Sequence, residues 1–124
     1  FGGCALIHKR NLRCSVTPFS VSSRRLFACS IELIDSLKFI LFNVYMPCDS
    51  SNVCDHDAYR EVLNEIESVL MQNNDVDYAI LGGDLNTDLV RVQSVHTVML
   101  NDFCNRLGLR PCMNAQSACR SRGS

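Results

Sequence analysis

Alternating apolar and polar positions predict the first long strand of the chain. From Leu26 to Leu33 the alternation has a period of two, which is typical of a strand with one buried face. After a turn at Asp35-Ser36, the run Lys38 to Met46 is almost continuously apolar, too short for a typical helix, and ended by Pro47. We therefore expect a central strand, paired with the first as a hairpin. The residues predicted for the buried face of the first strand are Phe27, Cys29, Ile31 and Leu33.

Two later segments show the spacing of amphipathic helices. Between Asp55 and Gln72 apolar residues recur at steps of three and four with charges between them. Asp55 or Asp57 suits the N-cap position, and Asn73-Asn74 would end the helix. Val95 to Leu107 shows the same spacing, with Gly108 as a plausible C-cap.

Shorter apolar runs complete the predicted sheet. Gly3 to Ile7 predicts a strand that ends at a polar turn, and a short strand near Val16 is followed by a loop as far as Arg25. Tyr78 to Leu81 predicts a further buried strand. Strands flanked by two helices predict an α/β fold with a mixed, mostly antiparallel sheet and helices on its outer face.

Composition limits the chain to one domain and gives no sign of a membrane span. The chain has 124 residues, of which 47% are hydrophobic and 20% charged, a balance typical of globular proteins. No stretch approaches the roughly 18 apolar residues of a membrane span. The net charge of -1 gives no global field for attracting nucleic acid, so any such contact has to be local.

The eight cysteines are scattered along the chain and contain no Cys-x-x-Cys pair. Structural zinc sites need such close pairs, so a zinc site is not expected. Several of the cysteines lie inside apolar runs, which favours small buried hydrophobic residues over a disulfide framework. They are Cys4, Cys14, Cys29, Cys48, Cys54, Cys104, Cys112 and Cys119.

The turn after the Tyr78 to Leu81 strand carries the first candidate chemistry. Two glycines precede Asp84 and Asn86, which places a carboxylate and an amide on a tight loop at the end of a rigid strand. If strand geometry continues through Leu85, both side chains face one cavity while Leu85 points into the core. The carboxylate could orient or deprotonate a water, and the amide could hold a phosphate oxygen. The alternative is an Asx-turn with a purely conformational role.

Tyr45 is the second candidate. It lies in the run Asn43-Val44-Tyr45-Met46-Pro47, which puts a phenol at the end of the central strand beside a rigid proline. The hydroxyl could donate to a phosphate oxygen, and the alternative is an aromatic residue that caps the core.

Together these motifs resemble the endonuclease/exonuclease/phosphatase superfamily, the DNase I-like proteins. The run Asn43 to Pro47, an amphipathic helix, and then Ile80 to Thr87 follow the order and spacing of that superfamily, and the likeness extends over Gly2 to Pro111. The Asn-x-Tyr-x-Pro strand and the Gly-Asp-Leu-Asn-Thr turn look most like the endonuclease domains of non-LTR (LINE-type) retrotransposons, which nick target DNA before reverse transcription. The resemblance implies part of a four-layer α/β sandwich.

The resemblance also implies roles for individual residues. Asp84 would position or activate the attacking water and is a possible metal ligand, Asn86 would help to hold that water and the phosphate, and Tyr45 would stabilise the phosphate charge. Arg25 matches a recurrent arginine of the superfamily, without an assigned chemical step. The implied reaction is in-line hydrolysis of a phosphodiester with one or two Mg²⁺ ions, and the implied partner is DNA bound by a monomer in the nucleus.

Other groups that the superfamily uses have no match here. Gly3 to Ile7 resembles a Gly-Gly-x-Ala strand of the superfamily. The unmatched groups are an Asn and a metal-binding Glu from strands that precede that strand, and an Asp-His pair from a Ser-Asp-His motif near the end of the domain. We expect His56 to be a solvated residue at a helix start, His96 to be an exposed polar residue, and His8 to lie in a turn.

These gaps leave three hypotheses for the function. Residues 1–111 are expected to form an incomplete endonuclease/exonuclease/phosphatase domain, an internal piece of a larger one, and residues 112–124 a disordered tail. The first hypothesis is a Mg²⁺-dependent endonuclease that needs the remaining groups for activity. The alternatives are a phosphatase of inositol or lipid phosphates from the same superfamily, and an inactive truncated scaffold.

Overall fold

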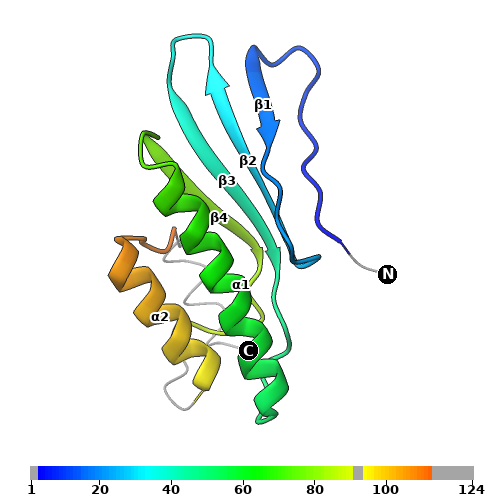
Figure 1. The fold of residues 1–124 in the computed structure, drawn as a ribbon, viewed down its shortest axis with the longest axis vertical. Helices are drawn as coiled ribbons and strands as arrows, with labels where there is room; N and C mark the ends of the chain where they lie inside the picture. Colours follow the sequence, from blue (N-terminus) through cyan, green and yellow to red (C-terminus); the bar gives the residue numbers. More distant parts are fainter. Residues whose placement is uncertain (1–2, 91–93, 113–124) are drawn as a thin grey trace, which may run out of the picture.

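The computed structural model describes residues 3–90 and 94–112, and these residues form four strands and two helices. The strands belong to a single sheet, and the two helices follow the third and fourth strands (Figure 1). The elements are β1 (Cys14–Pro18), β2 (Leu26–Leu33), β3 (Lys38–Tyr45), α1 (Val53–Gln72), β4 (Tyr78–Asp84) and α2 (Val95–Leu107).

The sheet has the strand order β1-β2-β3-β4. β1 pairs with β2, and β2 with β3, in antiparallel fashion, whereas β3 pairs with β4 in parallel. The parallel pair is possible because α1 carries the chain back along the sheet between the two strands. The predicted mixed, mostly antiparallel sheet is therefore confirmed, and so are the hairpin of β2 with β3 and the central place of β3.

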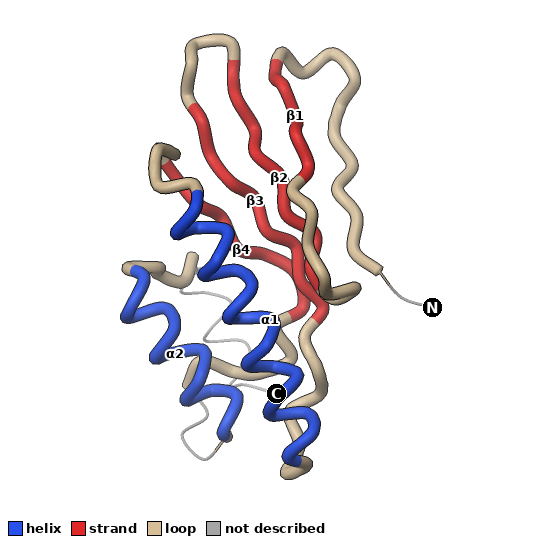
Figure 2. Tube along the Cα trace, viewed as in Figure 1, coloured by secondary structure: helices blue, strands red, loops and turns tan. Residues whose placement is uncertain are grey.

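Both helices lie on the same face of the sheet, with α2 beside α1 (Figure 2). The predicted helical layer on one face is thus confirmed. The core lies between this layer and the sheet, because alternate residues of β2 and β3 point toward the apolar stripe of α1. Its members include Leu26, Ala28, Ile40, Phe42, Val44, Tyr59, Val62, Leu63, Ile66, Leu100 and Phe103.

The opposite face of the sheet is open toward β4. Tyr78 and Ile80 of β4 are 62% and 48% exposed, and Tyr45 of β3 is 51% exposed. The described residues thus form two layers, one sheet and one layer of helices.

The predicted strand Gly3 to Ile7 is wrong. In the structure these residues are loop, because they form no ladder with the sheet. Side-chain bonds hold them instead: Asn43 Nδ2 donates to the carbonyl oxygen of Ala5 at 2.9 Å, and the Cys4 thiol donates to the carbonyl oxygen of Arg25 at 3.3 Å. The short strand near Val16 is confirmed as β1.

Most element boundaries match the prediction, with two differences at strand ends. β2 and α2 have the predicted bounds, and α2 ends at Gly108, whose φ of 70° is the left-handed C-cap conformation. β3 ends one residue before the predicted Met46, at Tyr45. β4 extends three residues beyond Leu81, because its pairing with β3 continues through both glycines to Asp84.

The start of α1 also differs from the prediction. The N-cap is Asn52, not Asp55 or Asp57, and Asn52 Oδ1 accepts a bond from the amide of Cys54 at 2.8 Å. The helix therefore begins at Val53, two residues early, and it ends as predicted at Asn73.

The predicted buried face of β2 is wrong in part. Leu26 and Ala28 face the helices, whereas Cys29 and Ile31 are buried on the other side of the strand. Because the middle of β2 is covered on both faces, the alternation of residues could not identify the helix-facing side.

The cysteines are free thiols wherever the structure describes them, so no disulfide joins any of these seven residues. The prediction that they are buried holds for Cys29, which is completely inaccessible. It is wrong for Cys48, Cys54 and Cys112, which lie in loops or at a helix start and are exposed. Cys119 and most of the predicted tail, residues 113–124, lie outside the described residues. In the part of the chain that is described, neither helix has the length and apolar character required to cross a membrane.

Candidate active site at the ends of strands β3 and β4

Tyr45 and Asp84 are direct neighbours in the sheet. They are paired positions of the parallel strands β3 and β4, and each is the last residue of its strand. The carboxyl ends of parallel strands meet at one edge of the sheet, where side chains can converge on a ligand. Both side chains are exposed. The structure therefore brings together two of the three candidate residues.

Gly83 allows β4 to pass close to β3 just before this edge. Its φ is +117°, which residues with a side chain rarely adopt. A Cβ atom at this position would lie 2.2 Å from the carbonyl oxygen of Val44 and 2.7 Å from its nitrogen. Gly82 faces no such obstacle, with no atom within 4 Å. The second glycine of the pair is thus the one that the Tyr45–Asp84 pairing requires.

Asp84 and Asn86 form an Asx-turn, so the conformational alternative is part of the structure. Asp84 Oδ1 accepts a bond from the Asn86 amide at 3.0 Å, and Asn86 has a left-handed φ of 51°. Strand geometry ends at Asp84, and the expectation that both side chains point the same way along a continued strand is wrong. The turn leaves Asp84 exposed while the Asn86 side chain is half-buried.

The Asn86 side chain binds the neighbouring segment. Its Nδ2 donates to the carbonyl oxygen of Met46 at 2.8 Å, and the Met46 amide donates to the carbonyl oxygen of Asp84 at 2.9 Å. These bonds continue the link between the two chain segments beyond the end of β3. An amide group has two N–H donors and a carbonyl acceptor, so this bond does not occupy the whole group.

Leu85 has the predicted role of packing against the core. Its carbonyl oxygen accepts a bond from the Tyr59 hydroxyl at 3.1 Å. Burial, and then the charge of Asp49, raises the pKa of Tyr59 well above its ordinary value, so the phenol remains a donor. This bond therefore ties the turn to α1.

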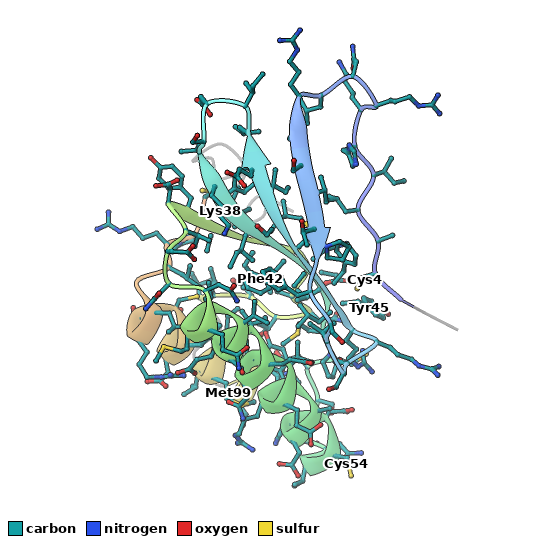
Figure 3. The ribbon with its side chains drawn as sticks, turned by 45° about the horizontal axis from the view of Figure 1, so that its top comes forward. Cys4, Lys38, Phe42, Tyr45, Cys54 and Met99 are labelled. Atoms are coloured by element: carbon teal, nitrogen blue, oxygen red, sulfur yellow. The ribbon has the colours of Figure 1, made fainter. Side chains whose placement is uncertain are left out.

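Arg25 provides a positive charge beside Tyr45. Its guanidinium carbon lies 5.8 Å from the centre of the Tyr45 ring, and its Nη1 donates to the Tyr45 carbonyl oxygen at 3.1 Å. The Tyr45 amide and the Cys4 thiol both donate to the Arg25 carbonyl oxygen, at 2.8 and 3.3 Å, and Figure 3 shows Cys4 and Tyr45 at the same end of the sheet. Two bonds thus hold Arg25 against the strand that carries Tyr45, and a third joins it to Cys4.

A groove of about 1030 Å³ adjoins Tyr45. It runs between the loop of residues 22–25 and α1, and the amides of Ser22 and Ser23 both donate to the carboxylate of Glu65 on that helix. Arg24 and Arg25 line the side of the groove that faces Glu61 and Glu65, so its charge is mixed.

The prediction for His96 is wrong, because its side chain is completely buried. His56 lies in the first turn of α1, as predicted, and is half-buried. The His96 ring stacks on Tyr59 with 4.2 Å between ring centres, and its Nδ1 lies 3.8 Å from Asp49 Oδ1. Burial lowers the pKa of His96 more than the nearby Asp49 raises it, so the ring is neutral at pH 7 and the pair is not an ion pair. His56 Nε2 donates to the Ser50 carbonyl oxygen at 2.8 Å. His8 is exposed in a loop as expected.

Sequence reasoning missed a polar cluster behind the turn, formed around Asp49. Thr87 and Ser94 both donate to its Oδ2, at 3.0 and 2.6 Å. The signal that could have found it is the clustering of Ser94, His96 and Thr97 at the start of α2, polar residues at positions that the helical pattern assigns to the core.

Asp84 is the carboxylate of this edge that could hold a metal ion. Among the described residues there is no group of three or more His, Cys, Asp or Glu side chains with the geometry of a metal site. Mg²⁺ is commonly bound by only one or two carboxylates, together with waters and substrate phosphates. Asp84 fits the role of one such carboxylate ligand of Mg²⁺.

Comparisons with protein-family models, with curated proteins and with solved structures find no match for this chain. The case for a function therefore depends on the residues and the geometry described above.

Proposed function

We propose that this chain carries part of the active site of a Mg²⁺-dependent phosphodiesterase, an endonuclease-like protein of the retrotransposon type that nicks DNA. The observation that carries the proposal is the pairing of Tyr45 with Asp84 at the carboxyl ends of β3 and β4. A phenol and a carboxylate, both exposed on one edge of a rigid sheet, supply a donor for a phosphate oxygen and an acceptor for a proton of water.

Each residue has a separate role in this reaction. The oxygen of a water molecule attacks the phosphorus while Asp84 orients that water and takes its proton. The bond to the leaving sugar oxygen breaks, and that oxygen takes a proton from solvent to leave as a hydroxyl. The Tyr45 hydroxyl donates to a non-bridging phosphate oxygen, and Arg25, 5.8 Å from the Tyr45 ring, adds positive charge beside it. Asn86 keeps the turn in place through Met46 and contacts the phosphate with the rest of its amide.

Mg²⁺ would be held by Asp84, and when bound it would balance the charge that develops on the phosphate. The nearby groove supports a polymeric substrate, because a strand that continues from the cleaved phosphate needs room beside Tyr45. Its volume of about 1030 Å³ provides that room.

In the proposed four-layer sandwich, the described residues would form two of the layers, one sheet and one layer of helices. In that fold a second sheet would cover the open face that carries Tyr78 and Ile80, which are 62% and 48% exposed. The resemblance implies that the Asn and Glu come from strands that precede the Gly-Gly-x-Ala strand, and the Asp-His pair from a motif near the end of the domain. The chain alone is therefore proposed to be incomplete as a catalyst.

Nicking of supercoiled plasmid DNA tests this function, using the longest natural chain that contains these residues. We expect Mg²⁺-dependent conversion to open circles. Asp84→Asn should lower the rate by about 100-fold or more, because the proton acceptor is lost. Tyr45→Phe should lower it by about 10- to 100-fold, the usual effect of removing a hydrogen bond to a charged group. Asp75→Asn is the matched control, since Asp75 is an exposed carboxylate in the loop before β4 and should not affect the rate.

A second substrate separates the remaining alternatives. The same proteins are assayed with phosphoinositides in vesicles, under the same Mg²⁺ concentration. Hydrolysis of the phosphoinositide without nicking would replace the endonuclease with a lipid or inositol phosphatase. Absence of both activities from the longest natural chain would contradict the proposal and favour an inactive scaffold.

A further inference from the structure

A buried polar cluster lies behind the turn that carries Asp84 and Asn86. We call it the Asp49 cluster, and its members are Asp49, Thr87, Ser94 and Thr97. They come from three segments: the loop after β3, the turn after β4, and the start of α2. The Asp49 side chain is 11% exposed, and Ser94 and Thr97 are buried. These are polar groups inside the protein, so their bonds to one another are important for stability.

The carboxylate of Asp49 joins the three segments. Its Oδ2 accepts from Ser94 Oγ at 2.6 Å and from Thr87 Oγ1 at 3.0 Å. Thr87 Oγ1 also lies 2.8 Å from Thr97 Oγ1, and Thr97 donates to the carbonyl oxygen of Asp88 at 2.6 Å. Hydrogen bonds from hydroxyls to a carboxylate are shorter and stronger than those between neutral groups. Ser94 is also the N-cap of α2, so the same carboxylate ties the turn to that helix.

The Asp49 cluster extends the link between the two segments that carry Tyr45 and Asp84. Beyond the paired strand ends, Met46 and Asn86 are already joined by the bond from Asn86 Nδ2 to the Met46 carbonyl oxygen, at 2.8 Å. The bond from Thr87 to Asp49 is the next one along the chain. Without it, Thr87 would lose its bond to the loop that follows Tyr45, and Ser94 would be left to join that loop to the start of α2.

Asp49 is separated from the edge where chemistry is proposed. It contacts buried residues on the helical side of the sheet, including His96, whose Nδ1 is 3.8 Å away. Asp84 is exposed at the strand end. Asp49 therefore lies behind the turn, and its bond to Thr87 ties it to the segment that carries Asp84.

We propose that Asp49 is a positioning residue for the Tyr45–Asp84 site and that it acts through the hydroxyl of Thr87. Its effect on catalysis rests on the proposed function, whereas its effect on the order of the turn does not. Groups that orient a reacting residue from behind commonly change activity by 10- to 100-fold when they are removed.

Amide hydrogen exchange measures the order of the turn. The informative amides are those of Asn86, bonded to Asp84 Oδ1, and Met46, bonded to the Asp84 carbonyl oxygen. We expect Thr87→Val to raise the exchange rate of both amides by about 10-fold or more, and Thr87→Ser to leave them within about twofold, because serine keeps the hydroxyl. Asp49→Ala should raise the exchange rate at least as much as Thr87→Val, because it also removes the bond from Ser94. The double variant should be no worse than Asp49→Ala alone. Asp57→Ala is the control, because Asp57 is an exposed carboxylate paired with Arg60 on α1.

The same variants are then assayed for nicking in the longest natural chain. Thr87→Val should lower kcat by about 10-fold with little change in KM, and Thr87→Ser should restore it. Suppose that Thr87→Val speeds exchange of the Asn86 amide but the wild-type chain does not nick DNA. That result would support the positioning role and contradict the proposed function. Equal protection of Asn86 and Met46 in wild type and Thr87→Val would overturn the positioning role, whatever the activity. The Thr87 pair decides the outcome even if Asp49→Ala does not fold.

Discussion

Gly83 is the residue on which the geometry of the candidate site depends most directly. Its φ is +117°, and a Cβ atom there would lie 2.2 Å from the Val44 carbonyl oxygen, so there is no room for a side chain. We expect Gly83→Ala to lower the free energy of unfolding by at least about 2 kcal/mol, because the strand must shift or adopt a strained backbone. Gly82→Ala is the matched control and should be neutral or slightly stabilising. Urea denaturation measures both, and equal effects would contradict the close approach of β4 to β3.

His96 should make the stability of the protein depend on pH. Burial lowers the pKa of His96 below its ordinary value of 6.5, and the nearby His56 lowers it further. Asp49 and Asp55 raise it, but not enough to offset the burial. The pKa of His96 is lower in the folded protein than in the unfolded chain. As the pH falls below about 6.5, the unfolded chain therefore binds more protons than the folded protein does. The contribution of the neutral ring to the free energy of unfolding is therefore fully present above pH 6.5. It is lost as the pH falls toward the pKa of His96 in the folded protein.

The change in unfolding free energy between pH 7 and pH 5 checks this dependence. One proton accounts for a slope of at most about 1.4 kcal/mol per pH unit. We expect His96→Phe, which keeps a ring against Tyr59, to flatten the slope, and His8→Phe to leave it unchanged because His8 is exposed. A slope that is the same in wild type and His96→Phe would show that His96 is not buried in its neutral form.

At the scale of single elements, the N-cap of α1 can be tested with two identical substitutions. Asn52 Oδ1 accepts from the Cys54 amide at 2.8 Å, so Asn52→Ala should cost about 1 kcal/mol. Asn64 is exposed in the interior of the same helix, where alanine is favoured over asparagine, so Asn64→Ala should gain a few tenths of a kcal/mol. Denaturant midpoints measure both. Loss of stability at Asn64 but not at Asn52 would place the start of the helix elsewhere.

Elements with a complete local pattern can be predicted well from the sequence, and contacts between distant segments cannot. α2 has the predicted bounds because its apolar spacing and Gly108 are both local signals. Gly3 to Ile7 has a strand-like composition, but a strand needs a partner, and the sequence does not reveal that one is missing. The burial of His96 and the role of Asp49 depend on contacts such as that of Asp49 with Thr87, 38 residues away. The proximity of Tyr45 and Asp84 could be inferred only through the resemblance of the motifs.

At the scale of the whole molecule, the open face of the sheet should control self-association. β4 is an edge strand, and its Ile80 is 48% exposed. Exposed apolar side chains on a sheet edge favour pairing with another copy. We expect the 124-residue chain to associate at high concentration and Ile80→Lys to reduce this. Val53→Lys is the control, because Val53 is 66% exposed at the start of α1, away from β4. Sedimentation velocity measures the effect, and equal association of both variants would contradict a role for this face.

The proposed active site is tested most directly by Mn²⁺ binding to the 124-residue chain, followed by NMR. Mn²⁺ replaces Mg²⁺ at oxygen ligands and broadens the signals of nearby nuclei. We expect the amides of Tyr45, Asp84 and Asn86 to broaden first, because these residues share the edge formed by the ends of β3 and β4. Asp84→Asn should abolish this broadening, and Asp75→Asn should preserve it. Broadening that is centred elsewhere, or that survives in Asp84→Asn, would contradict a metal-dependent site at this edge of the sheet.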